Sequence, residues 1–309
     1  MPKYVRKMTL LAKAETTFQT DAAPTAALNA IRAYDVSLVP LEGDEVKIPF
    51  IKPHFGADPT VQVTAYKSMT FFVPFSGVAT AGASPGVADL LRMCATSVTT
   101  AAGVKTTFAP ITSGLESGTI YANIDGIKHV SLGVRGNAEI TLDAKGLPAW
   151  KFDLKGTFVP LVDEALPTGV VYTRFLTQLP VNKTNTTLTL DGIALAASSF
   201  SFNMGLQVNK EDLINVDEVD ISGRESTASV TFRSEALSVR DWVGLHRTRT
   251  QVALVVTHGQ GATNKVRLAA PRAEIGKPSY GDSNGVQMIT LPLRLIPSDS
   301  GNDEWSIEI

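Results

Sequence analysis

Apolar and polar residues alternate along most of the chain, and this pattern predicts a mainly β protein. Gly-containing turns, such as Asp125-Gly126, Asp191-Gly192 and Asn284-Gly285, separate many of the alternating runs. The predicted strands cover residues 68–75, 118–124, 129–134, 138–144, 149–158, 187–193, 199–204, 228–234, 251–258, 265–270 and 286–296.

Two short segments have helical rather than alternating spacing. Residues 85–98 begin with Pro-Gly and place apolar side chains on one helical face, including Leu90, Leu91 and Cys94. Residues 238–248 form the second segment, for which Ser238 is the predicted N-cap. We therefore expect two short helices among antiparallel strands.

The two helical segments belong to an internal repeat. Each follows a Thr-Phe strand and contains Val-x-Asp before two bulky residues; Ala-Glu-Ile and an apolar-apolar-Pro strand end follow in both copies. The matched positions are Thr70-Phe71 and Thr231-Phe232, 87–91 and 239–243, 138–140 and 273–275, and 158–160 and 295–297. Because the order of these matches is conserved, the sequence predicts two tandem, related β modules, each with one short helix. The predicted boundaries are 1–165 with an N-terminal arm, a Pro-punctuated connector at 166–186, and 187–309.

Residues 40–61 combine charges, prolines and exposed-looking apolar side chains, a mixture that suits neither a helix nor a central strand. The repeat places a similar segment at 207–223. Two interpretations remain open: irregular loops on a monomer, or arms that bind a partner, and the apolar content favours the second. The arm ahead of residue 20 is another candidate for a segment that orders only on assembly.

Composition narrows the possible functions of the 309-residue chain. Hydrophobic residues make up 44% and charged residues 19%, which allows a large packed core. A formal net charge of −2 argues against a basic nucleic-acid binder. The single cysteine, Cys94, excludes an internal disulfide framework and a multi-cysteine zinc site. The apolar run 8–11 is too short for a signal peptide, and no run is long enough to span a membrane.

The sequence contains no convincing catalytic, cofactor-binding or metal-binding motif. The histidines are scattered, without metal-ligand spacing, and no nucleophile elbow is present. Carboxylates such as Asp44, Glu45, Glu116 and Asp125 are more typical of solvated turns than of a glycosidase pair. We therefore expect a protein that is not an enzyme and that binds no cofactor.

Several blocks together resemble the tail tube, or major tail, proteins of long-tailed bacteriophages. They are LLAKAETTFQTDAAPTAALNAI (10–31), PLEGDEV (40–46), KPHFGADPTV (52–61), PGVADLLRMC (85–94) and the run from TFAPI to LKGTF (107–158). The resemblance covers roughly residues 9–165, and the internal repeat extends it to the second half. It implies a tube module similar to the type VI secretion tube subunit, a β-sandwich or barrel with a flanking helix.

The resemblance also implies an assembly. Six modules form a ring around a continuous inner β-barrel, and rings stack into a hollow conduit for DNA. Two modules per chain imply a trimeric ring with pseudo-sixfold symmetry; a hexamer whose second module decorates the exterior is the alternative. The implied partners are the protein itself, the tape measure, tail tip and terminator proteins, and DNA that passes non-specifically. The expected location is the virion of a siphovirus, after assembly in the host cytoplasm, without membrane insertion.

By analogy with the family, the two unusual segments reach the neighbouring ring. The expected inter-ring residues are Leu41, Val46, Ile48, Phe50, Ile51, Phe55, Leu213, Ile214 and Val219, and the expected module-helix residues are Asp89, Leu90, Leu91, Asp241 and Trp242. A second function class remains open, a carbohydrate-binding or adhesion protein made of β-sandwiches. Clustered exposed aromatic residues would favour it, but aromatic residues are only 7% of the chain.

Overall fold

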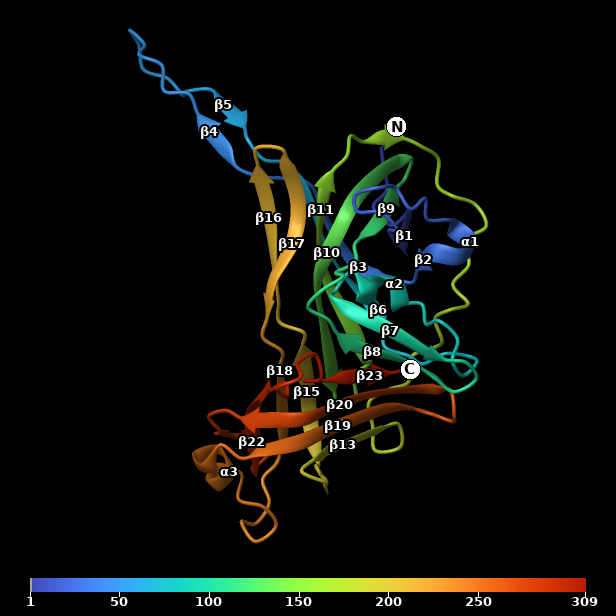
Figure 1. The fold of residues 1–309 in the computed structure, drawn as a ribbon, viewed down its shortest axis with the longest axis vertical. Coiled ribbons are helices and arrows are strands. Elements are labelled where there is room, and N and C mark those ends of the chain that lie inside the picture. The colour runs from blue at the N-terminus through green and yellow to red at the C-terminus, as the bar shows by residue number, and fades with distance from the viewer. Residues whose placement is uncertain (1) are drawn as a thin grey trace.

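The computed structural model describes residues 2–309 as an elongated, mainly β body from which one hairpin projects (Figure 1). The predicted fold class, mainly β, is confirmed. All strand pairings are antiparallel, and within the described residues they do not close into a barrel, so the architecture is that of packed, open sheets.

The first half of the chain contains most of the short elements. Its elements are β1 (Met8–Ala14), α1 (Ala26–Asn29), β2 (Ala30–Ile31), β3 (Tyr34–Glu42), β4 (Glu45–Lys47), β5 (Thr60–Gln62), β6 (Tyr66–Pro74), α2 (Ala88–Arg92), β7 (Thr96–Ala101), β8 (Lys105–Pro110), β9 (Gly118–Ile124), β10 (Ile127–Asp143), β11 (Ala149–Phe158) and β12 (Val162–Asp163). No helix or strand occupies residues 164–185.

The second half begins at the next strand and runs to the C-terminus. Its elements are β13 (Thr186–Leu190), β14 (Ile193–Ala194), β15 (Ala197–Asn203), β16 (Leu206–Leu213), β17 (Val216–Arg224), β18 (Thr227–Arg233), α3 (Trp242–Thr248), β19 (Gln251–Gln260), β20 (Asn264–Ile275), β21 (Ser279–Ser283), β22 (Val286–Leu295) and β23 (Ser306–Glu308).

The two halves have the same order of strand pairing. The first half pairs its strands in the order β2-β1-β9-β10-β11-β6-β3. The second half pairs them in the order β14-β13-β19-β20-β22-β18-β15. In both halves a hairpin interrupts the chain between the last two strands of that order, β4–β5 in one and β16–β17 in the other. A short helix, α2 or α3, follows the next strand along the chain.

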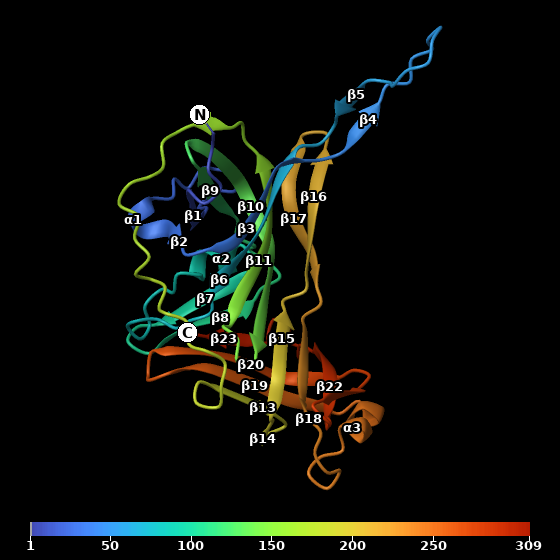
Figure 2. The same ribbon diagram turned by 180° about the vertical axis from the view of Figure 1, so that it is seen from behind.

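Two sets of strand pairings join the halves. The C-terminal part of β10 pairs with β15, from Glu139 opposite Asn203 to Asp143 opposite Ser199. The C-terminal strand β23 pairs with β8 of the first half and β20 of the second. Figure 2 shows β10, β11 and β15 side by side where the halves meet.

One continuous hydrophobic core runs through both halves. In the first half, the rings of Phe71 and Phe152 stack in this core with their centroids 5.7 Å apart. In the second half, the rings of Trp305 and Phe202 form a T-shaped pair with their centroids 5.4 Å apart, and the Trp305 indole N–H donates to Ser226 Oγ at 2.9 Å. The C-terminal segment is therefore part of the core, since a buried indole with a satisfied N–H holds it there.

Several expectations about local structure need correction. The helix predicted at 85–98 spans only α2, and β7 begins at Thr96 because this β-branched stretch pairs with β8. The N-cap of α3 is Asp241, whose carboxylate accepts from Gly244 N at 2.8 Å, so the assignment to Ser238 is wrong. Much of the N-terminal arm is ordered within the single chain: β1 pairs with β9, and its apolar side chains are buried. Met1 lies outside the described residues.

Lys67 of β6 is a buried charge whose ammonium group faces carbonyl oxygens. Its Nζ donates to Val130 O at 2.9 Å and Val159 O at 2.7 Å. Burial lowers the pKa of Lys67 to about 8, since desolvation disfavours the charged form.

This lowered pKa predicts a pH-dependent stability. Between about pH 8 and the unfolded-state pKa of 10.5, the unfolded chain holds a proton that the folded chain has lost, so stability rises with pH. Urea unfolding should show that, from pH 7.5 to pH 9.5, the free energy of unfolding of the wild type rises by on the order of 1 kcal/mol more than that of Lys67→Met. Lys47→Met, at an exposed site, is the control. Parallel pH profiles of wild type and Lys67→Met would contradict the lowered pKa.

Candidate assembly surface

Two hairpins leave the sheet at equivalent places. The β4–β5 hairpin leaves between the paired strands β3 and β6, and the β16–β17 hairpin between β15 and β18. The two differ in surroundings: β16–β17 lies along β10 and β11, whereas β4–β5 points away from the body (Figures 1 and 2). The segment 40–61, predicted to lack regular structure, is thus the end of β3 followed by a hairpin with an irregular tip.

A glycine forms the base of each hairpin. Gly43 has a φ of 146°, and a Cβ there would collide with the carbonyl oxygen of Thr64 across the base. Gly205 has a φ of 68°, and a Cβ there would collide with the carbonyl oxygen of Glu225. Both positions combine a backbone conformation that L side chains avoid with a close approach of the opposite strand, so only glycine fits. The shared geometry identifies these glycines as equivalent positions.

The β4–β5 hairpin carries an unusual number of exposed apolar side chains. At its tip Ile51 and Phe55 are fully exposed, and Phe50 is 60% exposed. Nearer the base, Val46 and Leu41 are exposed as well, whereas Ile48 is half-buried. Isolated exposed apolar residues are ordinary on protein surfaces, but a group of them on one projecting hairpin is typical of an interaction site.

The β16–β17 hairpin places its three predicted residues differently. Leu213 and Ile214, at the turn, are exposed. Val219 is completely buried, so its side chain, unlike those of Leu213 and Ile214, is not available to a partner. The reason is that the base of this hairpin packs on the first half of the same chain.

Two basic residues of the first half hold the β16–β17 hairpin in place. Arg135 of β10 donates from Nη1 to Val219 O at 2.9 Å and to the Asp220 carboxylate at 3.0 Å. Lys155 of β11 donates to Val208 O at 3.3 Å. The sequence did not single out these residues, because only the β10–β15 pairing brings the hairpin over their strands.

The five predicted helix residues are packing and capping residues. Leu90 and Leu91 are fully buried in the core, and Trp242 packs its edge against Phe232 at 5.8 Å. Asp89 lies 3.6 Å from Arg92, one turn further along α2, and Asp241 caps α3. These positions explain the repeated Val-x-Asp pattern as local helix architecture.

The described residues offer no obvious chemical site. Residues 2–309 contain no cluster of three or more His, Cys, Asp or Glu side chains that could hold a metal ion. The thiol of Cys94 is buried, and burial raises its pKa, which makes it unreactive. Among residues 2–309 we find no helix with the length and apolar character needed to cross a membrane.

Comparison with known protein families gives a match over most of the chain. A family model described as phage tail tube protein matches residues 6–294. The chain belongs to the phage tail tube protein family. No curated protein matches the sequence significantly. Since the match covers nearly the whole chain, both hairpins of this structural tail tube protein and its second half up to residue 294 lie within the family region.

The hairpin bases of this tail tube protein provide a matched test. Gly205→Ala should lower the free energy of unfolding by about 2 kcal/mol or more, since it adds a left-handed backbone penalty and a backbone collision. Gly56→Ala, in the tip of the other hairpin where an added Cβ meets nothing within 4 Å, should change it by less than about 0.5 kcal/mol. Equal effects in urea unfolding would contradict the role of the hairpin base.

Proposed function

We propose that this tail tube protein polymerises with itself as stacked rings that form the hollow tail tube of a siphovirus, through which DNA passes to the host. The observation that carries the proposal is the projecting β4–β5 hairpin with its exposed Phe50, Ile51 and Phe55. Apolar side chains on a projecting arm gain stability only when a partner covers them. Because every copy carries the same arm, a contact from ring to ring repeats along one axis and generates a filament.

We further propose that each ring contains three chains. The repeated strand order supports two tandem tube modules per chain, with the predicted connector, 166–186, in the stretch between β12 and β13. The β10–β15 pairing already joins two modules edge to edge within one chain. Three chains joined in the same manner supply six modules, which matches the ring implied by the sequence resemblance.

The polar face of the joined sheet is our proposed lining of the channel. On β10 and β11 one set of side chains is buried and the alternate set points outward, including Thr141 and Asp153. On this face Lys151 is paired with a carboxylate, since its Nζ lies 3.2 Å from Glu139 on the neighbouring strand. A surface without a basic excess releases few counterions from DNA, so phosphates slide past it rather than bind.

In such a tube, we propose, the protein contacts the tape measure, tail tip and terminator proteins. The tape measure protein would occupy the lumen before ejection, and the tip and terminator proteins would cap the two ends. The functional form is then the virion, with assembly in the host cytoplasm. Neither catalysis nor a bound cofactor is required for this role.

The hairpin tip can be tested by a triple variant. Replacing Phe50, Ile51 and Phe55 by Ser should leave the free energy of unfolding within about 0.5 kcal/mol per substitution, since the tip is exposed. It should raise the protein concentration needed for tube formation at least about tenfold, since each lost apolar contact costs about 1 kcal/mol or more. Electron microscopy and sedimentation would measure assembly.

The matched control for the triple variant replaces exposed apolar residues elsewhere. Val104→Ser and Leu237→Ser, on other loops, should leave tube formation unchanged. The proposal fails if the purified wild type stays monomeric at high concentration, or if the triple variant assembles as well as the control.

A further inference from the structure

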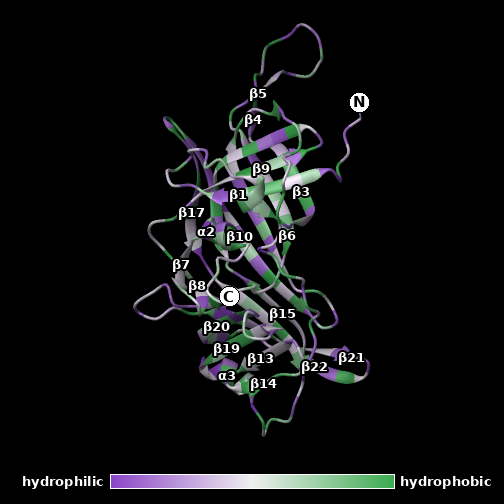
Figure 3. Cartoon of the chain, turned by 90° about the vertical axis from the view of Figure 1, so that its right-hand side faces the viewer, coloured by the Kyte–Doolittle hydropathy of each residue, from purple (hydrophilic) through white to green (hydrophobic). Residues whose placement is uncertain are grey.

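Two long sheet edges of the chain have no partner within the described residues. Strand β3 pairs with β6 on one side only, and β21 pairs only with β22. Figure 3 shows the β21–β22 hairpin at the side of the lower half, away from β3. All five residues of β21 are exposed, and Tyr280 among them is 60% exposed. Unpaired edges of this kind are templates for pairing with another chain.

The junction between the halves shows what each edge can bind. Strand β15, the counterpart of β3 in the repeated strand order, pairs with the C-terminal part of β10. That part of β10 turns back into β11, just as β21 turns back into β22. Strand β21 therefore occupies, in the second half, the position that residues 139–143 occupy in the first. The β10–β15 contact inside the chain is thus a template for a contact between β21 and the β3 strand of another copy.

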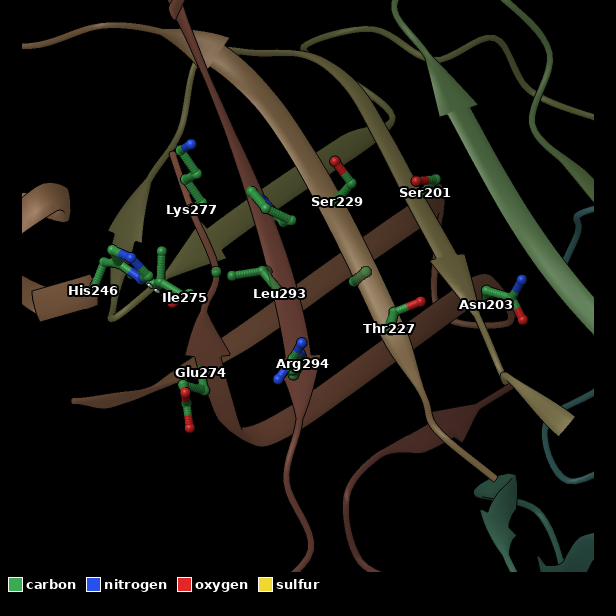
Figure 4. A pocket seen from close by; sticks show the side chains of 13 residues that line it. Ser201, Asn203, Thr227, Ser229, His246, Glu274, Ile275, Lys277, Leu293 and Arg294 are labelled. Carbon is green, nitrogen blue, oxygen red and sulfur yellow. Dashed lines mark hydrogen bonds between the residues drawn. The ribbon is translucent and has the colours of Figure 1, made fainter. Parts of the chain in front are cut away.

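A groove beside this edge supplies a second, independent argument. The groove has a volume of about 510 Å³ and lies on the polar face of β15, β18 and β22, where Ser201, Thr227 and Ser229 form its floor (Figure 4). Lys277 and Arg294 stand at its rim, together with one carboxylate, Glu274. One side of the groove is formed by Glu274 and Ile275 of β20 and by Arg294 of β22. In the repeated strand order β20 and β22 correspond to β10 and β11, whose surface the base of the β16–β17 hairpin covers in the first half. In the second half no described segment covers the groove.

Charge indicates what covers the groove in the assembled protein. In the first half, the basic side chains of Arg135 and Lys155 bind the base of the β16–β17 hairpin, which carries Asp220. In the second half, the exposed Lys277 and Arg294 make no salt bridge within residues 2–309. The base of the β4–β5 hairpin, the counterpart of β16–β17, carries the exposed carboxylates of Asp44 and Glu45.

We propose that β3 of one copy pairs antiparallel with β21 of a second copy, and that the base of its β4–β5 hairpin fills the groove beside Lys277 and Arg294. The partner is another copy of this chain. The contact buries Tyr280 on one edge and Val39 and Leu41 on the other, all exposed in the single chain. This inference rests on the proposed function, because it names the strands that close the proposed three-chain ring.

Cysteine crosslinking tests the strand pairing. Gly281→Cys is tolerated in β21, since an added Cβ meets nothing within 4 Å, and the native Cys94 is buried. It is combined with one cysteine in β3, at Ser37, Val39 or Leu41 in turn, which samples the possible registers along the strand. A disulfide requires Cα atoms within about 7 Å, so we expect the pair in register to crosslink on mild oxidation. The denaturing gel should show dimer and trimer bands and none larger.

The control pairs Gly281→Cys with Val104→Cys, in the exposed β7–β8 turn, and should remain monomeric on the gel. Electron microscopy of the same samples separates the two proposals. Rings without crosslinks in any of the three β3 variants would overturn the β3–β21 contact and leave the proposed function standing. Absence of rings and tubes in the wild type would overturn the proposed function itself. A ladder that continues beyond the trimer would overturn closure by three chains.

Charge reversal tests the groove separately. Lys277→Glu with Arg294→Glu should raise the concentration needed for assembly at least about tenfold, since two acidic side chains would then face Asp44 and Glu45. Adding Asp44→Lys and Glu45→Lys to the same chain should restore assembly, because the pairing of opposite charges returns. Circular dichroism verifies folding of each variant. Unchanged assembly in the first variant, or no recovery in the second, would overturn the placement of the hairpin base in the groove.

Discussion

The pairing between β10 and β15 is the contact on which the rest of the structure depends. Strand β10 pairs with β9 along its first part, then shifts register between Ser131 and Val134, and later pairs with both β11 and β15. A bulge of this kind bends a strand so that it serves two sheets. Without the β10–β15 ladder the halves would be joined mainly by the connector and β23; with it, one hydrogen-bonded sheet crosses the boundary between them.

This ladder also makes two similar hairpins behave differently. It places the β16–β17 hairpin over β10 and β11, where Arg135 and Lys155 bind its backbone and Val219 becomes buried. The β4–β5 hairpin has the same kind of glycine base but no neighbouring half beyond it, so its apolar tip stays exposed. The difference comes from position in the chain and not from the hairpins themselves. The second half lies against the first within one chain, whereas the β4–β5 hairpin of the first half has no such neighbour among the described residues.

Alternation predicted the strands that have one buried and one solvated face. The bounds of β9 and β11 agree with the predicted 118–124 and 149–158, and the predicted break between residues 134 and 138 is absent, since β10 is one continuous strand. Strands with little burial, such as β3 and β21, gave too weak a pattern to be recognised. The helix predicted at 85–98 was too long because pairing of β7 with β8 competes with local helical spacing. Of the candidate surface, the exposed tip was anticipated, whereas Val219, Arg135 and Lys155 were not.

The sequence by itself determined that the chain is mainly β, and it singled out an apolar, proline-containing segment at 40–61. These properties depend on residue type and short-range order, which a linear pattern carries. The tertiary structure decided which edges remain unpaired, which hairpin is anchored, and where the groove beside Lys277 and Arg294 lies. Those outcomes depend on which strand pairs with which across more than a hundred residues of chain, as where Met8 of β1 lies opposite Ile124 of β9. Local periodicity contains no information about such pairings, because any exposed edge can hydrogen-bond to any other.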